Sequence, residues 1–575
     1  MMQNFFSKIN SFAHIKKIIP NIWDIIIFFL FFCIAFAYLK AWNDMNIPIN
    51  MKHTVVLKIN NLFDYTIQTV LRMFIALFFS FIFTFIFGTL AAKYTSIGKI
   101  LIPLIDILQS VPVLGYLSIT ISGFMFLFPN SMLGPSFAAI FAVFTSQVWN
   151  MTLSFYQSLI TIPAELIEVT KLYQLSSWQR FWKLEVPFSI PGLIWNSMIS
   201  MSGGWFFIVA AEAISIGNQN ILIPGIGSYI ALAIEKKNIS AIIFAILDMS
   251  IIIFLYNKLL FQPIIAWSQK FYTNTRYIKS NSWIIEILQR GKVFQYLFDF
   301  MRNILDIFIN NNLCSKIFNI NTINIKKTYL ITFFWYFFIF LILFKIVNIF
   351  YNSFLLKVSL NTFFYVIELG FFTAIRVFSL IIICSFIWVP IGVWIGLHPK
   401  NTNTIQIVAQ FLASFPANLF FPFAFLIIIH FNLNFEIWCA PLMIFGTQWY
   451  ILFNIISGTK SIPKELKLVV KNIHLKGWLK WKRFLIPAIF PSLITGVITS
   501  AGGAWNASIV AEIINWGNQK LIAHGLGSYI TINTIKGNFS NIKLGIFIMC
   551  IWIIFINIIL WKPLYKYTKS RFTTE

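Results

Sequence analysis

Four charged residues stand out because they lie within, or at the end of, long apolar segments. Arg72 and Arg376 fall inside two such segments, and Glu212 and Glu512 end two others. A charge inside a membrane is costly and by default indicates a functional site. We expect the two arginines either to line a substrate pathway, where their charge would favour an anion, or to snorkel towards the lipid headgroups.

The two glutamates allow two interpretations as well. Glu212 and Glu512 could cap or pair at an external gate, or they could be solvated helix ends. Gly203 and Gly503 lie in the same two segments, and we expect these small residues to let helices pack closely.

Catalytic and metal-binding patterns are absent from the sequence. The His, Asp and Glu residues do not cluster at catalytic spacing, and the five Cys residues form no Cys-x-x-Cys pair. A phosphate-binding loop of the form Gly-x-x-x-x-Gly-Lys-Ser/Thr is also missing. We therefore expect a protein that is not an enzyme, with no catalytic residues, no metal and no cofactor of its own.

Composition indicates that a membrane-embedded scaffold positions these residues. The chain is 59% hydrophobic and 11% charged, whereas soluble domains average about 45–50% and about 25%. We predict an all-α integral membrane protein with about twelve transmembrane helices of about 20 or more residues each. The predicted spans are 24–42, 67–92, 101–128, 134–156, 189–212 and 239–262, then 328–350, 366–397, 404–431, 435–457, 489–513 and 541–562.

The two series of spans are copies of one six-helix unit. Residues such as Pro163, Glu165 and Glu212 recur 300 positions later as Pro463, Glu465 and Glu512. Upstream the spacing is 304, which matches Thr69 and Arg72 to Thr373 and Arg376. Such a match indicates duplication and fusion. Six helices per copy predict parallel topology, with a pseudo-two-fold axis along the membrane normal.

Basic residues predict the orientation and the boundaries of the copies. Most of the 43 Lys and Arg residues fall on one side, which places both termini in the cytoplasm. We expect copies at 1–265 and 328–575, joined by a basic cytoplasmic linker at 266–327. Within this linker apolar residues recur at near-helical spacing, which predicts an amphipathic helix on the inner leaflet, serving as a tether or a regulatory element. The net charge of +25 fits lipid contact, and we expect no nucleic-acid binding because no soluble basic domain is present.

A polar segment follows the fourth span of each copy. The first runs from Ile162 to Gly192 and the second from Ile462 to Ser492. Each begins Ile-Pro-x-Glu-Leu and ends in a Pro-x-x-x-Pro turn at Pro187 or Pro487, where we expect the chain to turn back into the bilayer. Between these prolines the pattern predicts a short amphipathic helix.

These segments resemble the cytoplasmic EAA loop of ATP-binding-cassette importer permeases, most closely the nitrate/sulfonate/taurine branch. Glu168-Val169-Thr170 and Gln174 stand at the Glu-Ala-Ala and Gly positions of the first copy, and Leu468-Val469-Val470 and His474 stand there in the second. Both copies therefore depart from the family pattern. The resemblance extends to Ser110-Val111-Pro112 and Ser414-Phe415-Pro416, and it covers nearly the whole chain outside the linker.

The resemblance implies a type I importer fold and a set of partners. Each loop would dock on a cytoplasmic ATPase subunit, so that one chain seats two ATPases, which use the ATP. An external binding protein would deliver a small molecule such as an anion, and the complex would lie in the bacterial cytoplasmic (inner) membrane. The implied ATPase-coupling residues are Pro163, Glu165, Glu168, Gln174, Pro187, Pro463, Glu465, His474 and Pro487.

Two other functions fit twelve helices. A secondary, ion-coupled transporter would also have two halves, but it would need ion carriers within the spans, which are scarce here. A polytopic membrane enzyme would need a catalytic cluster.

The two polar segments are not equal. The second loop is the more basic and lacks the Glu found at position 168 of the first, which predicts unequal ATPase contacts.

Overall fold

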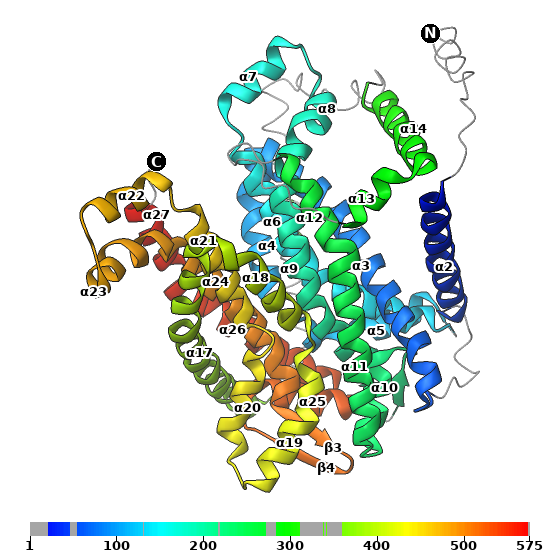
Figure 1. Cartoon of the computed structure of the whole chain (residues 1–575). Helices are drawn as coiled ribbons and strands as arrows, with labels where there is room; N and C mark the ends of the chain where they lie inside the picture. Colours follow the sequence, from blue (N-terminus) through cyan, green and yellow to red (C-terminus); the bar gives the residue numbers. More distant parts are fainter. Residues whose placement is uncertain are drawn as a thin grey trace. The chain divides into compact units, whose positions relative to one another are not determined.

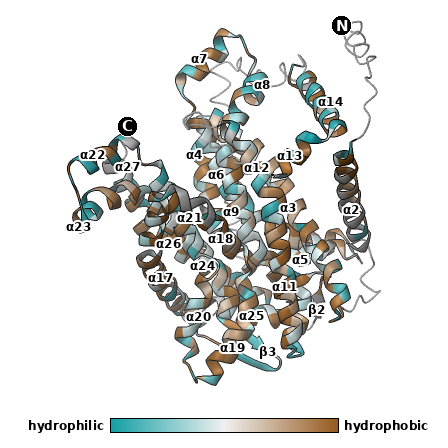
Figure 2. Ribbon diagram, viewed as in Figure 1, coloured by the Kyte–Doolittle hydropathy of each residue, from teal (hydrophilic) through white to brown (hydrophobic). Residues whose placement is uncertain are grey.

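The computed structural model describes residues 21–45, 55–129, 131–216, 219–271, 283–310, 337, 341, 345 and 359–572. Helices make up most of this part of the chain, and two small hairpins supply the strands (Figure 1). Figure 2 shows that apolar residues cover the long helices, as expected for elements in lipid.

The described helices of the first copy alternate long spans with short connecting helices. They are α2 Ile22–Met45, α3 Ile59–Lys93, α4 Thr95–Ser110, α5 Val113–Leu127, α6 Leu133–Ile160, α7 Ala164–Leu172, α8 Ser177–Arg180, α9 Val186–Glu212, α10 Ile226–Glu235, α11 Ile239–Tyr256 and α12 Gln262–Ser268. The linker contains η4 Gln269–Phe271, α13 Trp283–Arg290 and α14 Lys292–Ile309.

The second copy repeats this order. Its described helices are α17 Leu360–Leu397, α18 Pro399–Ser414, η6 Ala417–Phe420, α19 Phe421–His430, α20 Phe435–Ile444, α21 Gln448–Ser461, α22 Lys464–Asn472, α23 Gly477–Lys480, α24 Ile486–Ala511, α25 Leu526–Ile535, α26 Phe539–Ile556 and α27 Lys562–Phe572. The predicted span 328–350 lies outside the described residues, apart from Phe337, Leu341 and Lys345.

Six helices of the described residues are long and apolar enough to cross a membrane, or eight if two bent pairs each count as one span. α2 and α6, of 24 and 28 residues, coincide with two further predicted spans. The prediction of an all-α membrane protein is therefore confirmed. Each remaining predicted span except 328–350 coincides with a helix or a broken helix.

The third span of each copy is broken, which corrects the prediction of single helices at 101–128 and 404–431. α4 ends at Ser110, and Pro112 stands at the N-cap of α5. In the second copy the two halves bend by 73° around Phe415 and Pro416. The residue before a proline disfavours helical backbone, and Val111 and Phe415 are both extended, so the two Pro residues end the helices.

The fifth and sixth spans each contain a π-turn, at η2 Phe181–Glu185 and η3 Asn257–Phe261 in the first copy and at η7 Trp481–Leu485 and η8 Asn557–Trp561 in the second. All four end two residues before a proline. Val186 N–H, for example, donates to the Phe181 carbonyl five residues back, and Pro187 follows. A proline cannot donate to the carbonyl four residues back and clashes with it, and the wider π-turn accommodates this.

This arrangement corrects the predicted turn at Pro187 and Pro487. Both prolines lie inside continuous helical stretches, Ser177–Glu212 and Gly477–Ala511, so the chain does not turn there. The fifth span of each copy thus extends directly into the polar segment that precedes it.

A two-stranded antiparallel hairpin follows each fifth span. β1 Ala213–Ile216 pairs with β2 Gln219–Leu222, and β3 Ile513–Trp516 pairs with β4 Gln519–Ile522. The hairpins were not predicted. The repeated Gly-Asn between apolar runs, at 217–218 and 517–518, is a hairpin signal that the sequence carried.

The chain divides into two compact units. One contains Met1–Lys40, Gln157–Trp195 and Leu255–Leu330, and the other contains Ala41–Tyr156, Asn196–Phe254 and Ile331–Glu575. The larger unit therefore includes parts of both copies, and in it α5 packs against α24, α25 and α26.

Close helix packing at Gly203 and Gly503 is confirmed. A methyl carbon at Gly203 would lie 2.6 Å from the Tyr450 hydroxyl, and one at Gly503 would lie 2.7 Å from Cγ2 of Thr447. Both distances are too short for a Cβ atom at these positions.

Candidate functional site

Two buried ion pairs connect the second and fifth spans, one in each copy. Thr69 and Arg72 share a face of α3 because they are three residues apart. Nη1 of Arg72 lies 2.7 Å from Oε1 of Glu212, and the Thr69 hydroxyl donates to the same carboxylate at 2.8 Å. Arg72 and Glu212 are both 0% exposed. We call Thr69, Arg72 and Glu212 the first cluster.

Glu212 also fixes the chain that follows the hairpin. Gly227 N–H donates to Oε2 of Glu212 at 2.9 Å, and the Ile226 N–H donates to the Thr69 hydroxyl at 3.1 Å. A side chain at Gly225 or Gly227 would overlap Glu212, so glycine is required for this close approach. The first cluster thereby joins α3, α9 and the start of α10.

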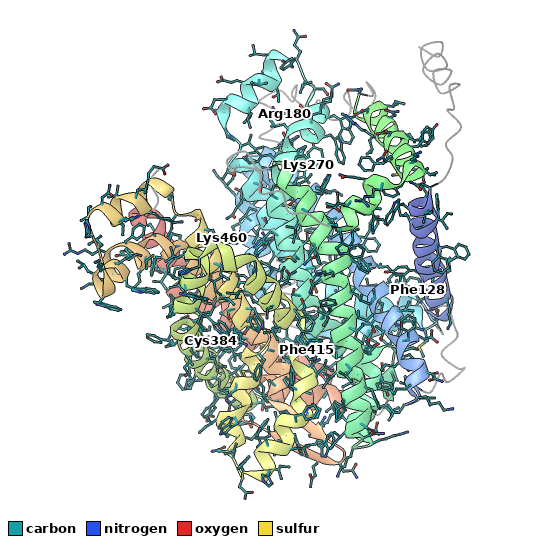
Figure 3. All side chains as sticks on the ribbon, viewed as in Figure 1. Phe128, Arg180, Lys270, Cys384, Phe415 and Lys460 are labelled. Carbon is teal, nitrogen blue, oxygen red and sulfur yellow. The ribbon has the colours of Figure 1, made fainter. Side chains whose placement is uncertain are left out.

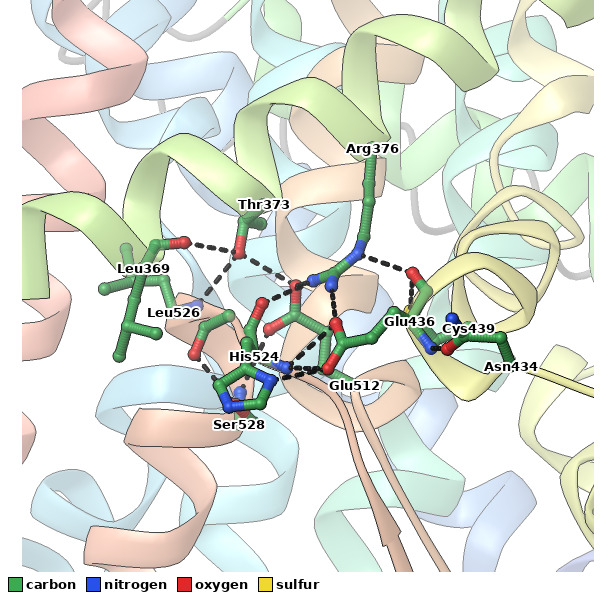
Figure 4. Close-up of polar contacts among 11 residues, drawn as sticks. Leu369, Thr373, Arg376, Asn434, Glu436, Cys439, Glu512, His524, Leu526 and Ser528 are labelled. Carbon is green, nitrogen blue, oxygen red and sulfur yellow. Dashed lines mark hydrogen bonds and ion pairs between the residues drawn. The ribbon is translucent and has the colours of Figure 1, made fainter.

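The second copy repeats this geometry at Thr373, Arg376 and Glu512, which we call the second cluster (Figure 4). The Thr373 hydroxyl donates to Oε1 of Glu512 at 2.8 Å, and Nη1 of Arg376 lies 3.1 Å from the same oxygen. Leu526 N–H donates to the Thr373 hydroxyl at 2.9 Å. The threonine, the arginine, the glutamate and the backbone N–H that donates to the threonine thus all recur 300 or 304 residues later.

Arg376 has a second carboxylate partner, whereas among the described residues Arg72 has one. Its Nη2 donates to Oε2 of Glu436 in the first turn of α20, and its Nε donates to the Glu436 carbonyl at 3.0 Å. His524 joins the group, because its N–H and its Nδ1 lie 3.0 Å and 2.6 Å from Oε1 of Glu436 (Figure 4).

The first copy cannot form this additional link in the same way. Pro224 stands 300 residues before His524 and has no N–H to donate. Nε of Arg72 is buried, and no hydrogen-bond partner for it is found among the described residues. The two arginines therefore differ in how fully their donors are satisfied.

These positions exclude one sequence-based alternative for each pair of residues. α3 begins at Ile59, eight residues before the predicted start, so Arg72 lies deep in the helix and is paired inside the protein. Arg376 is 8% exposed and is also enclosed. Glu212 and Glu512 are 0% exposed, so they are not solvated helix ends, and each pairs with the arginine of its own copy.

The two polar segments fold alike around a residue in the left-handed region. Gln174 has φ 50° and His474 has φ 55°. Leu175 N–H donates to the Thr170 carbonyl at 3.0 Å, and Gln174 N–H donates to the Lys171 carbonyl at 2.9 Å. These two bonds form a Schellman cap at the end of α7.

α22 ends in the same cap. Leu475 N–H donates to the Val470 carbonyl at 3.2 Å, and His474 N–H donates to the Lys471 carbonyl at 3.1 Å. Gln174 and His474 therefore adopt the conformation that glycine favours, although neither is glycine. Both copies thus form the same turn without glycine.

Most of the sequence-predicted coupling residues are exposed on these segments. Pro163 and Pro463 stand at the N-caps of α7 and α22. The exposed members are Pro163, Glu165, Glu168, Gln174, Pro463, Glu465 and His474, whereas Pro187 and Pro487 are half-buried in the helices that follow.

The segments differ beyond the cap. A capping box between Ser176 and Gln179 starts α8, and Arg180 (Figure 3) pairs with Glu185 at 3.0 Å. α23 begins at Gly477, with φ 55°, and has no side-chain cap. Trp178 is 7% exposed, whereas its counterpart Trp478 is 74% exposed.

Sequence reasoning missed Glu436 and His524. Neither has a counterpart of the same type in the first copy, so comparing the repeats could not single them out. Thr69 and Thr373 were recognisable, because each stands three residues before an arginine in both copies.

Comparison with known proteins gives the same result for both halves of the chain. The family model described as "Binding-protein-dependent transport system inner membrane component" matches residues 84–262 and again residues 388–573. Two matches in tandem show a fused pair of permease units.

The individual relatives align with this chain over only part of their length. A bicarbonate transport system permease protein of Synechocystis sp. is 33% identical over 109 residues, 19% of this chain and 37% of that protein. A nitrate import permease protein of Leptolyngbya laminosa is 28% identical over 157 residues, 27% of this chain and 51% of that protein. A bicarbonate permease of Synechococcus elongatus is 25% identical over 183 residues, 32% of this chain and 59% of that protein.

The chain thus spans about half the length, or less, of these relatives. The family match, by contrast, covers more than half of the chain and both of its repeats. The apolar helices, the duplicated ion pairs and the two matches agree. The chain belongs to the family of binding-protein-dependent transport system inner membrane components.

Proposed function

We propose that this chain forms the membrane pathway of an ATP-driven importer and that each polar segment docks one cytoplasmic ATPase subunit. The observation that carries the proposal is the pair of Schellman-capped segments, which repeat one backbone geometry in two places. A permease without a phosphate-binding loop of its own needs ATPase partners, which would hydrolyse the ATP.

Exposed apolar side chains on these segments support docking. Val169, Leu172 and Tyr173 are 44%, 82% and 76% exposed on α7 and its cap. Leu468, Val469 and Ile473 are 59%, 48% and 64% exposed at α22. Apolar residues exposed on a polar segment are typical of a protein contact.

The substrate we propose is a small anion, delivered by an external binding protein. The support comes from the relatives, which are permeases for bicarbonate and nitrate. We place the complex in the bacterial inner membrane with both termini in the cytoplasm, as the distribution of Lys and Arg favours.

Arg72, Arg376, Glu212 and Glu512 enter this proposal as supports of the pathway. Each guanidinium already has a carboxylate within 3.1 Å, so its charge is compensated. We propose that the clusters hold the hairpin and the helix after it against the second span, so that these elements move together when the pathway changes between its two states.

The docking is tested by counting ATPases. Tyr173→Asp and Ile473→Asp occupy matched positions in the two segments. Each should reduce the ATPase recovered with the purified chain from two copies to one, and the double variant should retain none. Lys520→Asp, on the exposed strand β4, is the control and should retain two. Full association in the double variant would refute docking at these segments.

The transport itself is tested in proteoliposomes. Uptake of labelled nitrate or bicarbonate should require the ATPase, ATP and the binding protein. Uptake driven by an ion gradient without ATP would instead identify a secondary transporter.

A further inference from the structure

The linker helix α14 has one polar face and is otherwise apolar. Its polar face carries residues at helical spacing, namely Lys292, Gln295, Asp299, Arg302, Asn303 and Asp306. The intervening residues are apolar, and the large ones are well exposed: Leu297, Phe298, Met301, Ile304 and Leu305 are 42–62% exposed. Such a helix is not stable in water without a partner for its apolar face.

The start of α14 is fixed to the first turn of α2. Oδ1 of Asp24 accepts hydrogen bonds from Val293 N–H at 3.0 Å and Phe294 N–H at 3.4 Å. Asp24 is 1% exposed, and it caps a helix that begins 268 residues later in the sequence. A carboxylate at this position satisfies free N–H groups and complements the positive end of the helix dipole.

Two further contacts make this junction tight. A methyl carbon at Gly291, between α13 and α14, would lie 2.9 Å from Oδ1 of Asp24, so glycine permits the close approach. The Arg290 guanidinium lies 5.5 Å from the centre of the Trp23 ring. α13 and α14 are therefore anchored on the residues that open α2 (Figure 1).

The other end of α14 reaches the first polar segment. Oδ1 of Asn310 accepts from Nε2 of Gln179 and from Nζ of Lys183, both at 3.3 Å. All these residues belong to the same compact unit. α14 thus bridges the start of the first helix and the end of the first segment.

We propose that α13 and α14 form an interfacial brace: their apolar face lies in the phospholipid leaflet at the start of α2, and Asn310 holds the first polar segment to it. The occupant follows from position, because the junction with α2 lies at the end of an apolar helix of 24 residues, where a bilayer surface would be. The polar face of α14 carries Lys292 and Arg302 but also Asp299 and Asp306, so binding should not depend on anionic lipid. Only the link to ATPase coupling rests on the proposed function.

The lipid contact is tested by spin labels on the full chain in nanodiscs. All five native Cys are replaced by Ser, and single labels are placed by Met301→Cys and Leu305→Cys on the apolar face and by Asn303→Cys on the polar face. Labels at 301 and 305 should be accessible to oxygen and shielded from a water-soluble nickel complex, and the label at 303 should show the reverse. Lipid without anionic headgroups should give the same pattern.

Two results would overturn the lipid assignment. Nickel access at 301 equal to that at 303 would mean that water covers the apolar face. Shielding of 301 from both reagents would mean that protein covers it, either an ATPase or a second copy of the chain. Neither result depends on ATP-driven transport, so the failure of the brace and the failure of the proposed function are distinguishable.

The brace is tested by hydrogen exchange at its far end. Asn310→Ala should speed amide exchange in residues 177–185 at least fivefold and leave residues 477–485 unchanged, which serve as the internal control. Asn310→Asp keeps an acceptor oxygen and should restore the slow exchange. Unchanged exchange at 177–185 in Asn310→Ala would refute the brace.

Discussion

Arg72 and Arg376 occupy equivalent places in the two copies but have different numbers of partners. Arg72 relies on Glu212, whereas Arg376 binds Glu512, the Glu436 side chain and two backbone carbonyls, those of Glu436 and His524. The shared part, an arginine and a threonine on one carboxylate, joins the second span to the fifth in each copy. The added part ties α20 to the segment after the second hairpin.

The difference shows which contacts the fold requires and which are optional. A buried arginine needs at least one carboxylate, since an unpaired buried charge is strongly unfavourable. Each further hydrogen-bond partner makes the buried arginine less dependent on any single carboxylate. The second cluster should therefore tolerate the loss of a carboxylate better than the first.

The largest effect should follow from neutralising the shared carboxylate. Glu212→Gln leaves Arg72 without a charged partner and should lower the free energy of unfolding by about 3–5 kcal/mol. Glu512→Gln should lower it by about 1–3 kcal/mol, because Arg376 keeps Glu436. Thermal unfolding of the purified chain in detergent measures both. Equal losses would contradict the compensating role of Glu436.

Removing the extra partner should make the second cluster resemble the first. Glu436→Gln should cost about 1.5–3 kcal/mol, the range for a hydrogen bond to a charged group. The exposed Glu368 of α17 offers a control, and Glu368→Gln should be neutral. In a double-mutant cycle, Glu436→Gln with Glu512→Gln should cost more than the sum of the single variants. Additive losses would show that the two carboxylates do not share Arg376.

A smaller effect should come from the backbone donor that the first copy lacks. His524→Pro copies the residue found at Pro224 and removes both the N–H and the imidazole that contact Glu436. We expect a loss of about 0.5–1.5 kcal/mol, because His524 is 74% exposed on its side chain. His524→Ala keeps the N–H and should cost less. If the two variants lose the same stability, the backbone bond contributes nothing.

The smallest effect should be a gain. Gln174→Gly and His474→Gly should each stabilise the chain by up to about 1 kcal/mol, since a left-handed backbone strains any residue with a Cβ while glycine loses more entropy on folding. Lys171→Gly and Lys471→Gly, in the preceding helical turns, should instead destabilise by about 1 kcal/mol. A loss at 174 or 474 would show that the native side chain makes a contact that outweighs the strain.

The sequence was sufficient to predict the helical scaffold and to single out the charged residues of each cluster. Apolar length located the spans, and the repeat paired Arg72 with Arg376 and Glu212 with Glu512. It could not show that each arginine meets a glutamate 136 or 140 residues away, because that depends on helix packing. The breaks before Pro112 and Pro416 did have a sequence signal, because a residue before a proline disfavours helical backbone, but apolar segments on both sides led to the prediction of single spans.

The polar segments illustrate a different limit. The sequence lacks the glycine of the family pattern at 174 and 474, yet Gln174 and His474 both adopt the left-handed backbone that glycine favours. The caps at Thr170 and Val470 need only backbone groups, so the sequence at the turn can change at a small energetic cost.

The positions of the four π-turns also bear on the evolution of the chain. The turns stand before Pro187, Pro263, Pro487 and Pro563, two in each copy, and matched turns are 300 residues apart. A feature shared by both copies predates the duplication and belonged to the single unit that was duplicated. The link between Glu436 and His524, found in one copy of the described chain, was gained or lost afterwards. The proline-associated π-turns are thus the older feature, and the contacts of Arg376 show where the two copies have since diverged.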